Sequence, residues 1–94
     1  MSEPTLTQLL EQLAVRQPVA QRIWERNMRE RYGRSWEPYA GKVWLTLEFD
    51  YDDDPRWHCG FRAREEGGDV WALRAVRRSP EAAAAAMLED LSGS

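Results

Sequence analysis

Alternation of apolar and polar side chains over three consecutive segments is the feature that most limits the fold of this chain. The segments 42–50, 56–64 and 69–77 each divide into two registers, one of them mainly apolar. Period-two alternation is typical of β-strands with one buried and one solvated face. The connections 51–55 and 65–68 contain Asp, Gly and Pro and suit tight turns. The pattern predicts a three-stranded antiparallel sheet, with a buried face made of Val43, Leu45, Leu47, Phe49, Trp57, Cys59, Phe61, Ala63, Trp71, Leu73 and Ala75.

The solvated face of this sheet has a predictable register. Pairing that keeps both faces consistent places Trp44 opposite Arg62 and Glu48 opposite His58. It also places Gly60 opposite the arginine of the third strand, Arg74. Tryptophan and arginine would therefore meet on a surface open to water.

Helical spacing accounts for the remainder of the chain. Thr5 and Gln8 form a capping-box pair before a leucine stripe, which predicts a helix over about 5–16. A second helix is expected over about 18–32, ending at Gly33. A third is expected over about 80–91, with Ser79 as its N-cap. The predicted fold is one α+β domain over residues 1–94, ordered α-α-β-β-β-α, with the helices packed on one face of the sheet.

Length and composition exclude several classes of protein. Ninety-four residues suit one small domain, and no apolar run approaches the ~20 residues of a membrane-spanning helix. The beginning of the sequence has no secretory-signal pattern, and Cys59 is the sole cysteine, which suits a reducing compartment. We therefore expect a cytoplasmic protein with no membrane partner.

The charged residues are unevenly distributed along the chain. Residues 16–34 contain six arginines and two glutamates, whereas residues 48–54 contain five acidic side chains. The formal net charge of −3 has the wrong sign for a non-specific nucleic-acid binder and is too small for a DNA mimic. Two oppositely charged segments suit contact with another macromolecule, although solvated surfaces of an ordinary domain are the commoner explanation of such segments.

The residues that carry chemistry in other proteins do not form a recognisable catalytic or metal-binding motif here. Counted from Asp50, the acidic turn has Pro55 and Phe61 where a calcium loop needs glycine and glutamate. His58 and Cys59 are neighbours on one strand and point to opposite faces, so they cannot form a catalytic dyad. We expect no enzymatic activity, no metal and no cofactor.

The order of elements resembles two groups of proteins. Three strands followed by the alanine-rich segment 79–91 resemble the double-stranded-RNA-binding domain, which implies an α-β-β-β-α fold and RNA contacts from the final helix start and the first strand loop. Here the helix start carries Pro80 and Glu81, with Arg77 and Arg78 just before it, and the loop is rich in aspartate. The same ending is similar in size and style to small accessory proteins of bacteriophages and mobile elements, including anti-CRISPR proteins. This second resemblance implies an inhibitor that occupies a surface without catalysis.

The first hypothesis for function is a small non-enzymatic protein that masks or bridges a macromolecular partner, a protein before any other class. Its expected contact residues are Trp44, Arg56, His58, Arg62, Arg74, Asp50, Asp52, Asp53 and Asp54. The alternative is an RNA- or DNA-binding module that uses the solvated sheet face together with Arg22, Arg26, Arg29, Arg77 and Arg78. A third possibility is a homo-oligomer that hides Trp44 at a symmetric interface.

Overall fold

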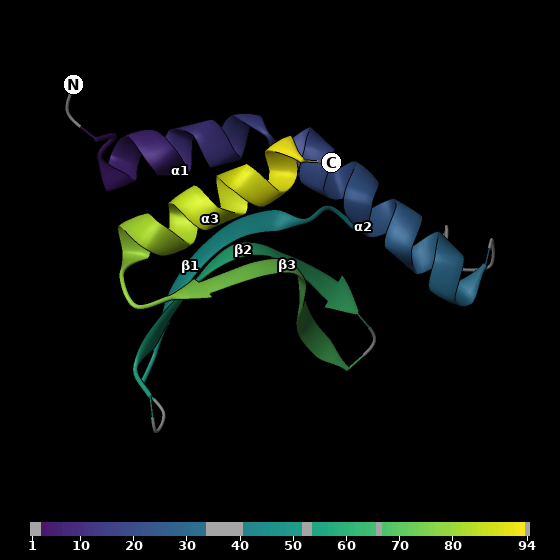
Figure 1. The fold of residues 1–94 in the computed structure, drawn as a ribbon. Helices are drawn as coiled ribbons and strands as arrows, with labels where there is room; N and C mark the ends of the chain where they lie inside the picture. Colours follow the sequence, from purple (N-terminus) through teal and green to yellow (C-terminus); the bar gives the residue numbers. More distant parts are fainter. Residues whose placement is uncertain (1–2, 34–40, 52–53, 66, 94) are drawn as a thin grey trace.

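The computed structural model describes residues 3–33, 41–51, 54–65 and 67–93 and confirms the predicted α+β fold. Three helices lie on one side of a three-stranded antiparallel sheet with strand order β1-β2-β3 (Figure 1). Each element lies within a few residues of its predicted position. The elements are α1 (Leu6–Val15), α2 (Gln17–Tyr32), β1 (Trp44–Asp50), β2 (Arg56–Glu65), β3 (Gly68–Arg77) and α3 (Pro80–Ser92).

The helix starts follow the capping signals of the sequence. The Gln8 backbone N–H donates to Thr5 Oγ1 at 3.2 Å, and the Thr5 N–H donates to Gln8 Oε1 at 2.9 Å, which completes the capping box of α1. At α3 the Ala82 N–H donates to Ser79 Oγ at 3.1 Å. These side chains satisfy N–H groups that have no partner inside the helix.

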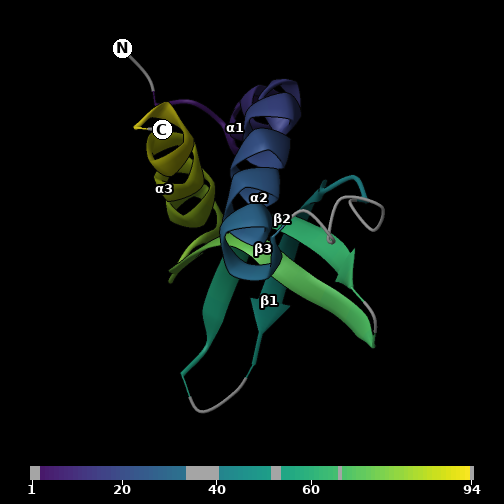
Figure 2. The same ribbon diagram turned by 90° about the vertical axis from the view of Figure 1, so that its right-hand side faces the viewer.

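The core lies between the helices and one face of the sheet, which we call the inner face. α3 packs against β2, β3 and α1, and its alanines allow a close approach, since Ala83 and Ala84 are fully buried. Figure 2 shows α3 beside the α1–α2 pair, with the sheet below all three helices. The buried residues form one cluster: Leu9, Leu13, Ala20, Ile23, Trp24, Met28, Val43, Cys59, Phe61, Ala63, Ala75, Ala83, Ala84, Met87 and Leu91.

The pairing of β1 with β2 and of β2 with most of β3 follows the predicted register. Trp44 lies opposite Arg62, Glu48 opposite His58 and Gly60 opposite Arg74. One prediction for β3 is wrong, because a β-bulge interrupts the ladder between Phe61 and Arg62.

The bulge moves Trp71 from the expected inner face to the opposite side of the sheet. Phe61 pairs with Leu73 while the next residue, Arg62, pairs with Trp71, so Ala72 is an extra residue on β3. Beyond the bulge Val70 takes the inner position opposite Ala63 and packs against the core. Side chains alternate along a strand, so an extra residue places the side chains on its far side on the opposite faces from those that strict alternation predicts.

Gly60 lies where β3 passes closest to β2. A Cβ atom added at Gly60 would lie 2.0 Å from the carbonyl oxygen of Leu73. Only a residue without a side chain fits there, and the close crossing accompanies a strongly coiled sheet (Figure 1). The sheet arches beneath the helices, so the face turned away from them is concave.

The far end of the β1–β2 hairpin extends beyond the helices. Phe49 points to the inner face but remains 44% exposed, and Tyr51 is 81% exposed. The Phe49 ring contacts the rings of Tyr51 and Trp57, with centroid distances of 5.5 Å and 5.1 Å. The helices therefore cover the middle of the inner face and leave its end at the β1–β2 hairpin uncovered (Figure 1).

No helix in the described part of the chain combines the length and apolar character needed to cross a membrane.

Candidate binding face of the sheet

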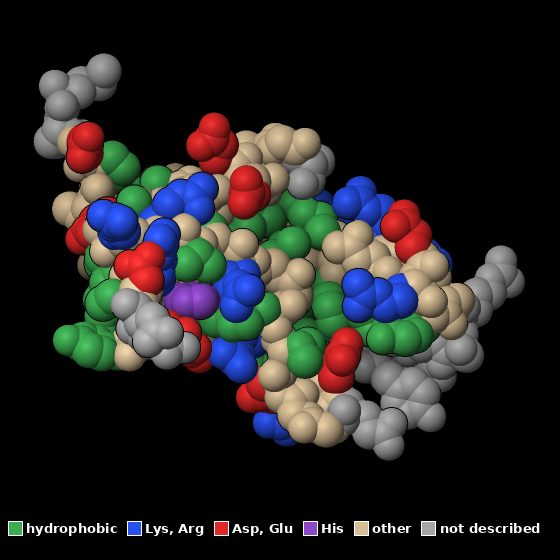
Figure 3. Space-filling model, turned by 60° about the horizontal axis from the view of Figure 1, so that its bottom comes forward, with side chains coloured by type: hydrophobic (Ala, Val, Ile, Leu, Met, Phe, Trp, Pro, Cys, Tyr) green, Lys and Arg blue, Asp and Glu red, His purple; other side chains and the backbone are tan. Residues whose placement is uncertain are grey.

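The candidate functional site is the concave face of the sheet that points away from the helices, here called the outer face. Figure 3 shows this side, with the histidine beside basic, acidic and apolar side chains. Among the described residues no helix covers it, because the helices pack on the opposite face of the sheet. By strand register the outer face carries Trp44, Thr46, Glu48, Asp50, Arg56, His58, Gly60, Arg62, Arg64, Asp69, Trp71, Arg74 and Val76.

A stack of cationic and aromatic groups occupies the centre of the outer face. The guanidinium carbon of Arg62 lies 4.8 Å from the centroid of the Trp71 ring, and that of Arg74 lies 5.9 Å from it. The His58 ring stacks on the same indole at 6.1 Å with an interplanar angle of 30°. We call these four residues the Trp71 cluster. Tryptophan is the most favourable ring for cation–π contact, so the cluster holds both arginines near fixed positions.

Ion pairs hold most of the arginines of the outer face. Arg62 Nη1 donates to Glu48 Oε1 at 2.9 Å, and Arg64 Nε approaches Asp69 Oδ1 at 3.5 Å. Arg56 pairs with the carboxylate of Asp54 through two donors. Within the described part of the chain, Arg74 has no ion pair. It is exposed, so a carboxylate of a partner could pair with its guanidinium without displacing an ion pair among these residues.

The structure brings the expected basic and acidic contact residues together. Asp50 lies opposite Arg56 on the neighbouring strand, and its Oδ2 is 3.7 Å from His58 Nε2. Asp54 contacts Arg56 as described above. Asp52 and Asp53 lie outside the described residues. Asp50 and Asp54 thus lie on one surface with Arg56 and His58.

Trp44 completes the outer face at its opposite end. Its side chain is 38% exposed, and its register position is beside Arg62. The guanidinium of the neighbouring Arg62 lies over the Trp71 ring rather than over Trp44. Trp44 therefore keeps exposed apolar surface next to the Trp71 cluster.

Trp71 is the site residue that the alternation pattern misplaced. A signal of ambiguity was present, because the register of β3 expected to face solvent contains Val70, Ala72 and Val76, all of them apolar. When both registers of a strand contain apolar residues, the sequence of the strand does not show which register faces the core. Here the bulge at Ala72 places Trp71 opposite Arg62 and therefore on the outer face.

The arginines of the nucleic-acid hypothesis are dispersed over other elements. Arg22, Arg26 and Arg29 lie exposed along α2, in the helical layer. Arg77 and Arg78 are exposed where β3 leads into α3, and Arg77 Nη1 donates to the Val76 carbonyl at 2.7 Å. None of them belongs to the outer-face register around Trp71.

Two observations on the described residues concern metal binding and the reactivity of the cysteine. Among the described residues no three His, Cys, Asp or Glu side chains are placed to hold a metal ion. Cys59 is buried in the core, and burial raises the pKa of its thiol from 9.0 to about 11. A thiol with this pKa remains protonated and is a poor nucleophile at neutral pH.

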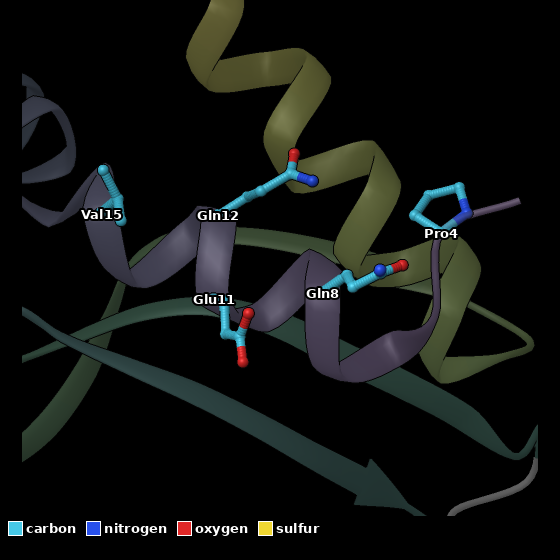
Figure 4. Close-up of a pocket in the computed structure, with 5 residues that line it drawn as sticks. All are labelled: Pro4, Gln8, Glu11, Gln12 and Val15. Carbon is cyan, nitrogen blue, oxygen red and sulfur yellow. The ribbon is translucent and has the colours of Figure 1, made fainter.

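A surface depression on α1 lies apart from the outer face. It is lined by Pro4, Gln8, Glu11, Gln12 and Val15. Figure 4 shows these side chains spread along the helix and pointing in different directions. Because binding pockets use convergent polar groups, this depression is not a candidate site.

Comparison of the chain with protein-family models, with curated protein sequences and with solved structures found no match.

Proposed function

We propose that this chain is a small binding protein that covers part of another protein with its outer face, without catalysis. The observation that carries the proposal is the Trp71 cluster beside the exposed Trp44. Tryptophan and arginine are the residues most enriched at the energetic centres of protein interfaces. Here they share a concave face that no described helix covers.

Preorganisation supports this use of the face. Arg62 is held by both the Glu48 carboxylate and the Trp71 ring, and its side chain is only 21% exposed. A side chain already fixed in the free protein loses less conformational entropy on binding. The partner that fits has apolar side chains for Trp44 and a carboxylate for Arg74.

The charge balance favours a protein over a nucleic acid. Three arginines of the outer face, Arg56, Arg62 and Arg64, already pair with acidic residues of this chain. A phosphate backbone would have to compete with these carboxylates and would meet Asp50 beside them. The faces of Trp71 are likewise occupied by arginine and histidine, which leaves little ring surface for stacking a base.

Masking of a host protein, as in phage-type inhibitors, is the form of this function that suits a chain of this size. The free thiol of Cys59 suits a reducing compartment such as the cytoplasm.

The test compares capture of partner proteins by the parent chain, by Arg74→Glu and by the control Arg16→Glu. Both substitutions change the charge of an exposed arginine by the same amount, but Arg16 lies between α1 and α2. Lysate of the organism that encodes the chain is used with and without nuclease, and recovered proteins are quantified by mass spectrometry. We expect the parent and Arg16→Glu to recover the same proteins, with and without nuclease. We expect Arg74→Glu to lose these proteins in both conditions.

Two results would contradict the proposal. Equal recovery by all three chains removes the outer face from consideration. Direct binding of labelled single- or double-stranded RNA that weakens steeply with salt and disappears in Arg74→Glu would instead assign the face to nucleic acid.

A further inference from the structure

β1 is an edge strand of the sheet, because the strand order is β1-β2-β3. It pairs with β2 along its whole length, and among the described residues no strand pairs with its other side. The backbone N–H and C=O groups on such an edge are a template for another strand. The edge of β1 can therefore pair with a further strand.

α2 closes the beginning of the edge. The Val43 N–H donates to Gln21 Oε1 at 2.8 Å, and the Val43 carbonyl accepts from Gln17 Nε2 at 3.0 Å. The N–H and C=O of one strand residue point to the same side, and this side alternates along the strand. The groups left on the open edge are therefore those of Leu45, Leu47 and Phe49, and the open edge is centred on Leu47.

The apolar side chains of these three residues are incompletely covered. Leu45 and Leu47 point to the inner face and are only partly buried, and Phe49 is 44% exposed. Their neighbours on β2, Cys59 and Phe61, are fully buried. An exposed apolar strip thus accompanies the unpaired backbone.

We propose that the occupant of this edge is β1 of a second copy of the chain, antiparallel to the first around a twofold axis at Leu47. This pairing joins two three-stranded sheets into one of six strands with all helices on one side. Leu47 then lies opposite Leu47 of the partner subunit, and Leu45 opposite Phe49 of the partner subunit. Thr46 lies opposite Glu48 of the partner subunit on the outer side.

The order of apolar and polar residues in the segment Leu45–Phe49 favours pairing with a second copy in this register over other registers. Its apolar residues are symmetric about Leu47, so all three open residues find an apolar partner. An axis at Glu48 would oppose two carboxylates directly, which is unfavourable. An axis at Thr46 would require the backbone groups of Val43, which α2 already occupies. Only the axis at Leu47 pairs these three residues with one another.

The interface is small, because one short strand and its flanking side chains form it. Interfaces at the low end of the size range are weak, so we expect dissociation constants of about 10–100 μM. The outer faces of the two copies would be adjacent in the dimer, but the inference does not depend on the function proposed for them.

The experiment measures self-association by sedimentation equilibrium across micromolar to millimolar concentrations. Phe49→Lys places a charge opposite Leu45 of the partner subunit and is expected to weaken the dimer about tenfold or more. Tyr51→Lys is the matched control: it also replaces an exposed aromatic residue with lysine, but it lies beyond the open edge. It is expected to change the association less than about threefold.

Hydrogen exchange of the parent chain gives a measurement that needs no variant. The amides of Leu45, Leu47 and Phe49 are expected to exchange more slowly as concentration rises, while other exposed amides do not change. A chain that remains monomeric at millimolar concentration overturns the proposal and leaves the edge to an extended peptide of another protein. The proposal is also overturned by a dimer whose dissociation constant does not change in Phe49→Lys and in which these three amides remain unprotected. Arg74→Glu is expected to leave the association unchanged, which separates this test from that of the outer face.

Discussion

Replacing Gly60 with alanine tests how far the stability of the fold depends on the close crossing of β2 and β3. The added Cβ would lie 2.0 Å from the Leu73 carbonyl oxygen, 2.8 Å from the Leu73 carbonyl carbon and 2.9 Å from Arg74 Cα. All three are backbone atoms, so no side-chain rotation relieves the contact. Since real Cβ atoms stay beyond 3.0 Å, β3 must move by about 1.0 Å (3.0 − 2.0).

The cost of this movement follows from what the strand would lose. A shift at this point disturbs the ladder at the pairs Gly60–Arg74 and Phe61–Leu73, and each backbone hydrogen bond contributes about 1 kcal/mol net. Overpacking of a rigid site costs ~1–3 kcal/mol in addition. We expect Gly60→Ala to lower the free energy of unfolding by about 3 kcal/mol and Tm by roughly 12–24 °C.

Gly41→Ala is the matched control for this measurement. No atom lies within 4 Å of a Cβ added at Gly41, and its φ is outside the positive region. Both substitutions lower the entropy of the unfolded chain equally, so this effect cancels in their difference. The assay is urea unfolding followed by tryptophan fluorescence. A difference between the two variants below about 1 kcal/mol would refute the argument, because β3 would then absorb the clash at little cost.

Three further predictions concern the core, a helix cap and the start of β1. Raising the pH from 9 to about 11 should lower the free energy of unfolding by about 2–3 kcal/mol more in the parent than in Cys59→Ala, as measured by urea titration. The sign follows because the folded chain keeps the thiol proton that the unfolded chain loses above pH 9.0, so this stability is complete below pH 9.0. Ser79→Ala should cost about 1 kcal/mol by removing the acceptor for the Ala82 N–H, and an unchanged thermal midpoint would contradict it. Gln21→Ala should cost about 1–2 kcal/mol, because the Val43 N–H loses its acceptor, whereas Gln12→Ala on α1 should have no measurable effect in the same calorimetry.

Local spacing was sufficient to predict the helices and the pairing of the first two strands. The capping residues Thr5 and Ser79 lie within one turn of the groups they satisfy, so they act independently of the remainder of the fold. The register of β1 against β2 was also predictable, because a slip by one residue would expose Leu45 and Leu47 together.

The candidate site was predictable only in part. Arg62, Arg74 and His58 lie on the outer face as expected, but the residue that joins them, Trp71, was assigned to the core. Its side of the sheet depends on the bulge at Ala72, and both registers of β3 contain apolar side chains. The sequence of one strand cannot show which of its two registers faces the core when both registers are apolar.

The sequence by itself determined the class of fold, the helix boundaries and the amphipathic division of β1 and β2, because these depend on contacts between residues close in the chain or on a strict period of two. Only the tertiary structure decided the bulge, the crossing at Gly60, the position of Trp71 and the partial exposure of Leu45–Phe49. Each of these depends on how far β3 coils across β2 and how much of the sheet three short helices can cover. Both are properties of packing between distant segments, and no local pattern encodes them.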